Sequence, residues 1–361
     1  MFRNGFVRTG IFGGIFALLI RWVASPEWIE RYYSQGFFPL LRLVWDYAVG
    51  SWLPVAFVYI LILLLLVRWI RSLYRWSKRR GRDRWWAALA HVLGFLGWLV
   101  LTFLLLWGFN YGRVPVEDRL GLDWSNLPDT LIAEQVKAEA RVLTTLRAKL
   151  QRPDSIPLRS DLFPTDQEAQ LRQALEDALA YYAYPVVGRV RGRQLVPKGI
   201  FLHFSSAGLY LPWTGEGHID AGLLPLQQAY VLTHELAHGY GFGDEGTCSF
   251  WAYLASYYVE SPTLVYTIRL GYWRSLAAAW SRQDRAAYLA FRATLPPGIR
   301  ADLEAINANI LAYPDWTPVL RDVAYDAYLR SQGITEGLAN YSKVIKMVEA
   351  WRRTDDGFPG K

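Results

Sequence analysis

Two histidines separated by three residues bracket a glutamate in the segment HELAH, residues 234–238. The ten residues before it form an amphipathic run that begins Leu-Pro, which suits the first turn of a helix. On a helix, positions i and i+4 share a face, so both imidazoles can reach one Zn²⁺ ion. Glu235 can then face a zinc-activated water as general base. The spacing predicts a zinc metallopeptidase with His234 and His238 as metal ligands; an ordinary helix with coincidental histidines is the competing interpretation.

A catalytic zinc site needs a third protein ligand beside an open position. Residues 239–246 form a glycine-rich turn that carries Asp244 and Glu245, and a helix is predicted from about Thr247 to Val259. If that helix folds back, it can deliver a carboxylate. We expect Glu245 to be the third ligand, with Asp244 as the alternative, although both could simply cap the helix. A metzincin ending is absent, because position 244 is Asp rather than His.

Cysteine usage limits the metal chemistry further. The chain has one cysteine, Cys248, so it can form no intramolecular disulfide and no cysteine-rich zinc module. Any metal must therefore be held by histidine and carboxylate, and we interpret Cys248 as a small buried residue. Tyr341, or Tyr240 beside the histidines, could donate a hydrogen bond to the tetrahedral intermediate, with a packing role as the competing interpretation for each.

Three apolar segments precede the histidines and predict a multi-pass membrane protein. Residues 52–70 and 85–108 are each long enough to span a bilayer, and residues 9–24 form a shorter candidate, for which a cleaved signal peptide is the alternative. The basic loop 71–84, with its flanks, is expected in the cytoplasm by the positive-inside rule. Its eight positive residues are Arg68, Arg71, Arg75, Lys78, Arg79, Arg80, Arg82 and Arg84. Everything after the third helix is then outside.

The charge distribution argues against a nucleic-acid partner. Residues 1–109 carry 13 Lys and Arg against 4 Asp and Glu, whereas residues 110–361 carry 26 against 28. A domain that binds a phosphate backbone should itself be basic, and here the excess lies between apolar stretches. We therefore expect the lipid bilayer as partner, together with a peptide or protein substrate. Residues 26–50 predict helices in the membrane interface.

The remaining pattern predicts the fold class of residues 110–361. A linker is expected over Asn110–Asp123, then helices over 129–151 and up to about residue 182. The β-favouring runs GIFLHF (199–204) and GLYLPW (208–213) predict two or three strands. From residue 224 to the end the pattern is helical. The chain should thus combine three transmembrane helices with a mostly helical α+β domain containing a small sheet.

Several motifs resemble those of an uncharacterised bacterial family of membrane-anchored, gluzincin-like proteins that are predicted zinc peptidases. The resemblance covers nearly the whole chain and rests on ERYYSQGFFPLL (30–41), LLLWGFNYGRVPVEDRLGL (104–122), GLYLPWTGEGHID (208–220), THELAHGYGF (233–242) and NYSKVIKMVEAW (340–351). It implies a zincin-like extracytoplasmic domain anchored in the bacterial cytoplasmic membrane. It also implies that residues 215–220 lie where zincins carry the edge strand that pairs with a substrate. His218 within that segment is interpreted as an exposed strand histidine.

The second motif of that family resembles E-x-E-A-N-F, and it implies Glu245 as the metal ligand. Glu245 takes its first Glu and Phe250 its Phe, but Thr247, Cys248 and Ser249 replace the residues between. In related gluzincins, the residue four beyond the ligand Glu is usually Asp or Asn and supports a metal-bound His. Ser249 could still form this hydrogen bond, more weakly. The departure motivates a second hypothesis, a weakly active or inactive envelope scaffold with a zincin fold.

Overall fold

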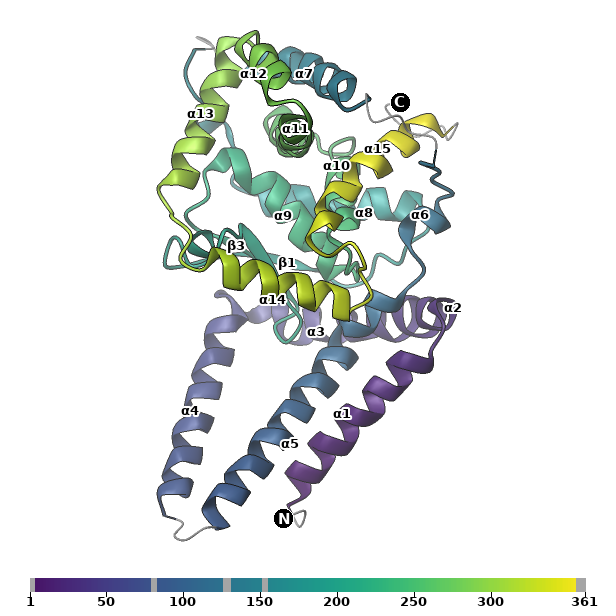
Figure 1. The fold of residues 1–361 in the computed structure, drawn as a ribbon, viewed down its shortest axis with the longest axis vertical. Helices are drawn as coiled ribbons and strands as arrows, with labels where there is room; N and C mark the ends of the chain where they lie inside the picture. The colour runs from purple at the N-terminus through teal and green to yellow at the C-terminus, as the bar shows by residue number, and fades with distance from the viewer. Residues whose placement is uncertain (1–3, 79–82, 126–130, 151–154, 355–361) are drawn as a thin grey trace. The chain divides into compact units, whose positions relative to one another are not determined.

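The computed structural model describes residues 4–78, 83–125, 131–150 and 155–354. It is mostly helical and contains one small three-stranded sheet, as the sequence predicts. The chain divides into two compact units (Figure 1). The first, here the N-terminal unit, comprises residues 1–114 with the short segments 187–189 and 211–216. The second, the C-terminal unit, comprises residues 115–186, 190–210 and 217–361.

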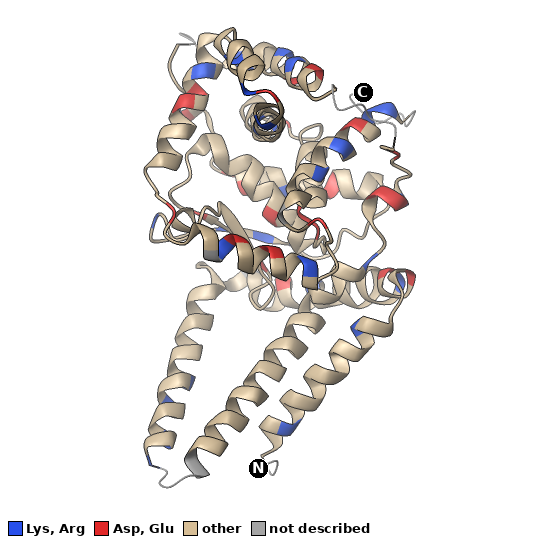
Figure 2. Cartoon of the chain, viewed as in Figure 1, with Lys and Arg blue, Asp and Glu red and all other residues tan. Residues whose placement is uncertain are grey.

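Three helices of the N-terminal unit are long and apolar enough to cross a membrane. They are α1 (Gly5–Val23), α4 (Phe57–Ser77) and α5 (Asp83–Leu106), and Figure 2 shows few charged residues along them. The predicted second helix starts too early, because residues 50–52 form a separate 3-10 turn (η2) and Pro54 precedes the start of α4. The expected loop from residue 71 is helical to Ser77, and its residues 79–82 lie outside the described ranges.

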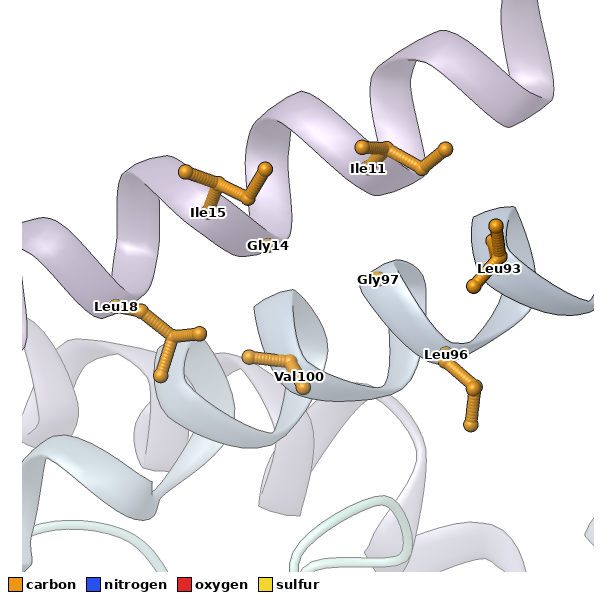
Figure 3. Close-up of a pocket in the computed structure, with 8 residues that line it drawn as sticks. All are labelled: Ile11, Gly14, Ile15, Leu18, Leu93, Leu96, Gly97 and Val100. Atoms are coloured by element: carbon orange, nitrogen blue, oxygen red, sulfur yellow. The ribbon is translucent and has the colours of Figure 1, made fainter.

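Glycines let α1 and α5 pack closely. A Cβ atom added at Gly10 would lie 2.1 Å from the carbonyl oxygen of Gly94, and one at Gly97 would lie 2.2 Å from that of Gly10. Gly14 and Gly97 face each other at this contact (Figure 3). Small residues four apart allow such backbone approach between apolar helices. A shallow apolar pocket flanks the contact, lined by Ile11, Gly14, Ile15, Leu18, Leu93, Leu96, Gly97 and Val100.

Residues 26–48 are helical as expected, in the order α2 (Pro26–Trp28), a π-helix η1 (Ile29–Phe37) and α3 (Phe38–Ala48). A buried ion pair on α3 joins Arg42 to Asp46 at 2.6 Å. Both side chains also bind the segments 187–189 and 211–216 of this unit. Asp46 accepts a hydrogen bond from the Arg189 backbone N–H at 2.8 Å, and Arg42 donates to the carbonyl of Gly215 at 2.7 Å. These two buried charges are therefore paired with each other within the unit.

Fourteen further helical elements are described after α5, the first eleven of them up to Leu311. They are η3 (Gly108–Gly112), α6 (Val116–Arg119), α7 (Leu131–Leu150), η4 (Ser160–Leu162), α8 (Gln167–Tyr181), η5 (Leu202–Phe204), α9 (Pro225–Gly239), α10 (Glu245–Ala255), α11 (Pro262–Gln283), α12 (Arg285–Ala293) and α13 (Pro297–Leu311). The chain continues with α14 (Pro318–Ser331), η6 (Gly337–Ser342) and α15 (Lys343–Arg353). The predicted linker from Asn110 is wrong in part, because η3 and α6 form there and Asn110 is buried.

The core of the C-terminal unit gathers around α9 and α10. Within this unit, α9 packs against α10, α11 and β1 (Figure 1). Every residue of α10 is buried, and the tryptophans Trp251, Trp273 and Trp351 from three different helices fill the space around it. Close-packed aromatic side chains of this kind restrict movement of the elements they join. The two helices that carry HELAH and Glu245 are therefore firmly held.

The sheet has the order β1–β3–β2, formed by β1 (Arg191–Leu195), β3 (Glu216–Asp220) and β2 (Gly208–Leu211). The segment expected as an edge strand, residues 215–220, instead supplies the central strand. The predicted strand at 199–204 is wrong as well. There the Asp220 carboxylate accepts the backbone N–H groups of Gly199, Phe201 and Leu202, which leaves those groups unavailable for strand pairing.

Candidate metal centre

The helix α9 positions both histidines and Glu235. Pro225 occupies its first turn, and the Gln227 side chain accepts a hydrogen bond from the Leu224 N–H at 3.2 Å. As the spacing predicts, His234 and His238 lie on one face, with ring centroids 4.9 Å apart. Their exposed fractions are 8% and 5%, so both rings are shielded from bulk solvent.

A tight turn after α9 returns the chain to deliver Glu245. The Asp244 carboxylate accepts the Thr247 N–H at 2.7 Å and caps α10, of which Glu245 is the first residue. The Glu245 Oε2 atom then lies 3.0 Å from Nε2 of His234 and 3.5 Å from Nε2 of His238. One ligand atom from each of the three residues lies within 4.8 Å of the others. The structure thus brings together the three residues predicted as ligands.

The outer nitrogen of each ring is engaged on the far side. Nδ1 of His238 lies 2.7 Å from the carbonyl oxygen of Phe242, and Nδ1 of His234 lies 3.1 Å from the Ser249 hydroxyl. A histidine whose Nδ1–H is hydrogen-bonded presents a lone pair on Nε2. Ser249 therefore forms the hydrogen bond to His234 that the sequence predicts for it. Both Nε2 atoms face the Glu245 carboxylate.

Glu235 is packed between α9 and the sheet. A Cβ added at Gly208 would lie 2.6 Å from Glu235 Oε1, and one at Gly217 would lie 2.8 Å from the Glu235 Cβ. The side chain is 5% exposed, and its Oε2 has no hydrogen-bond partner among the residues that the structure describes. Burial raises the pKa of Glu235 to about 8. The structure thus holds an unsatisfied carboxylate oxygen beside the histidines.

The surroundings of His234, His238 and Glu245 shift their pKa values in different directions. Burial lowers the pKa of His234. For His238, burial also lowers the pKa, but the ionised Glu245 carboxylate beside its Nε2 atom outweighs burial and raises the pKa above its usual value. Burial raises the pKa of Glu245, and this is more than offset by His238 and His234, so that the pKa is lowered. These shifts favour a protonated His238 beside an ionised Glu245 in the metal-free cluster.

Asp244 and Cys248 have other roles than ligation. Besides capping α10, Asp244 Oδ2 accepts hydrogen bonds from the Asn340 amide at 2.7 Å and from Lys343 at 3.1 Å. Cys248 is fully buried, and its sulfur lies 3.2 Å from Nδ1 of His238, on the side of the ring away from Glu245. Burial raises the pKa of its thiol to about 12, so it is not a thiolate. The prediction of a small buried residue is confirmed.

The tyrosines around the site differ from the sequence prediction. Tyr341 is 42% exposed, and its hydroxyl lies 3.5 Å from the hydroxyl of Tyr325 on α14. Tyr325 in turn donates to Glu245 Oε1 at 2.5 Å. Sequence reasoning missed Tyr325, because it stands 80 residues beyond Glu245 in a segment without a recognisable motif. Tyr240 bonds to Glu176 on α8.

His218 was expected to be exposed, and that expectation is wrong. It is 1% exposed on the central strand β3, and its Nδ1 lies 3.2 Å from the carbonyl oxygen of Leu209.

Comparisons with known proteins identify a family whose function is unknown. Residues 33–348 match the family described as "Protein of unknown function (DUF3810)". No curated protein and no solved structure matches the chain.

Proposed function

Because the chain belongs to the DUF3810 family, whose function is unknown, we propose its activity from its own residues: a membrane-anchored zinc-dependent metallopeptidase. The observation that carries this proposal is the geometry of His234, His238 and Glu245. Two donors each ~2.0 Å from one tetrahedral zinc ion lie about 3.3 Å apart. The distances from Glu245 Oε2 to the two Nε2 atoms, 3.0 and 3.5 Å, lie on either side of that value.

The donor set supports zinc as the metal. Two imidazoles and one carboxylate, with a fourth position left open, form the ligand set of catalytic zinc sites. Both rings are oriented through Nδ1, which in His238 donates to the carbonyl oxygen of Phe242 and in His234 is hydrogen-bonded to the Ser249 hydroxyl, as metal-bound histidines usually are. A zinc ion bound there would supply Lewis-acid chemistry, polarising a peptide carbonyl and lowering the pKa of water.

Glu235 would move the proton. Its Oε2 atom, which has no hydrogen-bond partner among the described residues, would accept a proton from the attacking water and later return it to the leaving nitrogen. Burial raises its pKa to about 8, and a cation held by the neighbouring histidines would favour the ionised form that can act as base. Tyr341 remains our candidate for a hydrogen bond to the tetrahedral intermediate.

Because β3 is the central strand of the sheet, the edge strand β2 is a better candidate than residues 215–220 for pairing with a substrate. Gly208 of β2 lies against Glu235, so a peptide added along this edge would pass close to the base. Leu209 on the same strand is 48% exposed. Backbone pairing of this kind gives affinity with little sequence selectivity. The proposal is therefore a peptidase that accepts extended segments of peptides or proteins.

The membrane arrangement is part of the same proposal. We infer that α1, α4 and α5 span the bacterial cytoplasmic membrane, that the basic residues around 71–84 lie in the cytoplasm, and that a zincin-like domain from about residue 110 lies outside. Residues 219–243 include Asp220, Gln227 and Gln228 and form no apolar span, which argues against cleavage within the bilayer. The substrate would be cut near the outer face of the membrane.

The test is hydrolysis of a casein-type substrate by the full-length protein in detergent. Glu235→Gln should lower the rate about 10²- to 10⁴-fold without loss of zinc, since it removes only the base. Glu134→Gln, on an exposed position of α7, is the matched control and should be fully active. Bound zinc with no cleavage that depends on Glu235 would instead favour the envelope scaffold.

A further inference from the structure

The two oxygens of the Glu245 carboxylate have separate partners. Oε2 faces the histidines, whereas Oε1 accepts the hydroxyl hydrogen of Tyr325 at 2.5 Å. A carboxylate on a single flexible side chain can rotate between one-oxygen and two-oxygen ligation. A hydrogen bond on one oxygen fixes that rotation and leaves the other oxygen to the metal.

We propose that Tyr325 is a positioning residue that holds Glu245 with Oε2 toward His234 and His238, so that metal affinity depends on helix α14. This inference rests on the proposed zinc site. It adds a specific contact from a helix that contributes no ligand.

Contacts at the start of α14 fix the place of Tyr325. Arg321, one turn earlier, donates to the carbonyl oxygen of Phe204 at 2.9 Å and forms an ion pair with Asp315. The Trp316 N–H donates to the carbonyl oxygen of His203 at 2.8 Å, and the two rings stack with centroids 4.2 Å apart. The start of α14 is thus anchored, and this fixes the position from which the Tyr325 hydroxyl reaches Glu245.

The neighbouring tyrosines provide matched controls. The Tyr328 ring stacks against the Tyr325 ring with centroids 6.0 Å apart, and the hydrogen bond to Glu245 Oε1 comes from the Tyr325 hydroxyl. Tyr341 touches the Tyr325 hydroxyl at 3.5 Å. Tyr325→Phe removes the hydrogen bond and keeps the ring, whereas Tyr328→Phe removes a hydroxyl from the same helix and keeps the bond. Loss of a partner that orients a ligand usually weakens metal binding ~10- to 100-fold.

The experiment measures the zinc dissociation constant of the full-length protein by competition with a chromophoric chelator, together with the absorption spectrum after Co²⁺ loading. We expect Tyr325→Phe to weaken zinc binding ~10- to 100-fold and to shift the Co²⁺ bands, because the carboxylate ligand is reoriented. Tyr328→Phe should change neither the affinity nor the spectrum.

Wild-type affinity and an unchanged Co²⁺ spectrum in Tyr325→Phe would overturn this inference while leaving the zinc site in place. Equal losses in Tyr325→Phe and Tyr328→Phe would also overturn it, because they would point to general loosening of α14. A wild-type protein that takes up neither metal would instead overturn the proposed function, and the inference with it.

Discussion

Gly208→Ala tests whether the close packing of β2 places Glu235. The added Cβ would lie 2.6 Å from Glu235 Oε1 and 2.7 Å from the carbonyl oxygen of His218. Ordinary contacts begin at 3.4 Å, so both gaps are too short. The His218 carbonyl belongs to the backbone of the central strand and cannot readily retreat. The Glu235 side chain must therefore move by roughly 0.8 Å, the difference between the ordinary contact and the 2.6 Å gap, and strand β2 must also shift to relieve the contact with the His218 carbonyl.

A displacement of that size is large for a proton-transfer group. A misplacement of ~1 Å can lower a rate about 10²-fold, whereas overpacking of a core usually lowers the free energy of unfolding by ~1 to 3 kcal/mol. The three atoms nearest to the added Cβ belong to Glu235 and His218, neither of which is a predicted metal ligand. We therefore expect Gly208→Ala to fold, to bind zinc as the wild type does, and to cleave peptides about 100-fold more slowly.

The assay is kcat/KM on a quenched fluorescent peptide, with zinc content measured on the same samples. Gly5→Ala is the control for the glycine-to-alanine exchange, because a Cβ there meets nothing within 4 Å. Full activity of Gly208→Ala would refute the claim that β2 fixes Glu235. Loss of zinc together with activity would also contradict it, because the damage would then lie at the ligands.

Three further predictions concern the ligands and their supports. Ser249→Ala should weaken zinc binding ~10- to 100-fold, measured by chelator competition, because His234 loses the partner of its Nδ1. Zinc binding should release protons at neutral pH, because the raised pKa values of His238 and Glu235 favour the protonated forms of both groups in the metal-free protein. Affinity should therefore fall as the pH is lowered, and calorimetry in buffers of different ionisation enthalpy measures the release. Asp244→Ala should lower the free energy of unfolding by ~1 kcal/mol through loss of the α10 cap, with zinc stoichiometry retained.

Local sequence information was sufficient for most of the cluster. The i, i+4 spacing of His234 and His238 needs only a helix, and the amphipathic run before them predicts one. The residues alone do not show whether Asp244 or Glu245 faces the histidines; in the structure Glu245 does, and Asp244 caps the helix. The long apolar helices were likewise predictable from composition, although the exact start of α4 was not.

Long-range contacts were not predictable in the same way. Tyr325 reaches Glu245 through the packing of α14, and nothing in its neighbourhood signals that contact. The order of the strands depends on β1, whose polar sequence RGRQL gives a weak strand signal. The false strand at 199–204 has β-favouring residues, yet a distant carboxylate, Asp220, takes up its N–H groups. In each case a partner far along the chain overrides the local preference.

The central claim is that His234, His238 and Glu245 hold one zinc ion. Elemental analysis of the purified full-length protein, compared with His234→Ala and Glu245→Ala, tests it most directly. The proposal predicts about one zinc per chain in the wild type and none in either variant, since a three-ligand site does not survive loss of one ligand. A wild-type protein that stays metal-free after zinc loading, or variants that keep the metal, would contradict it.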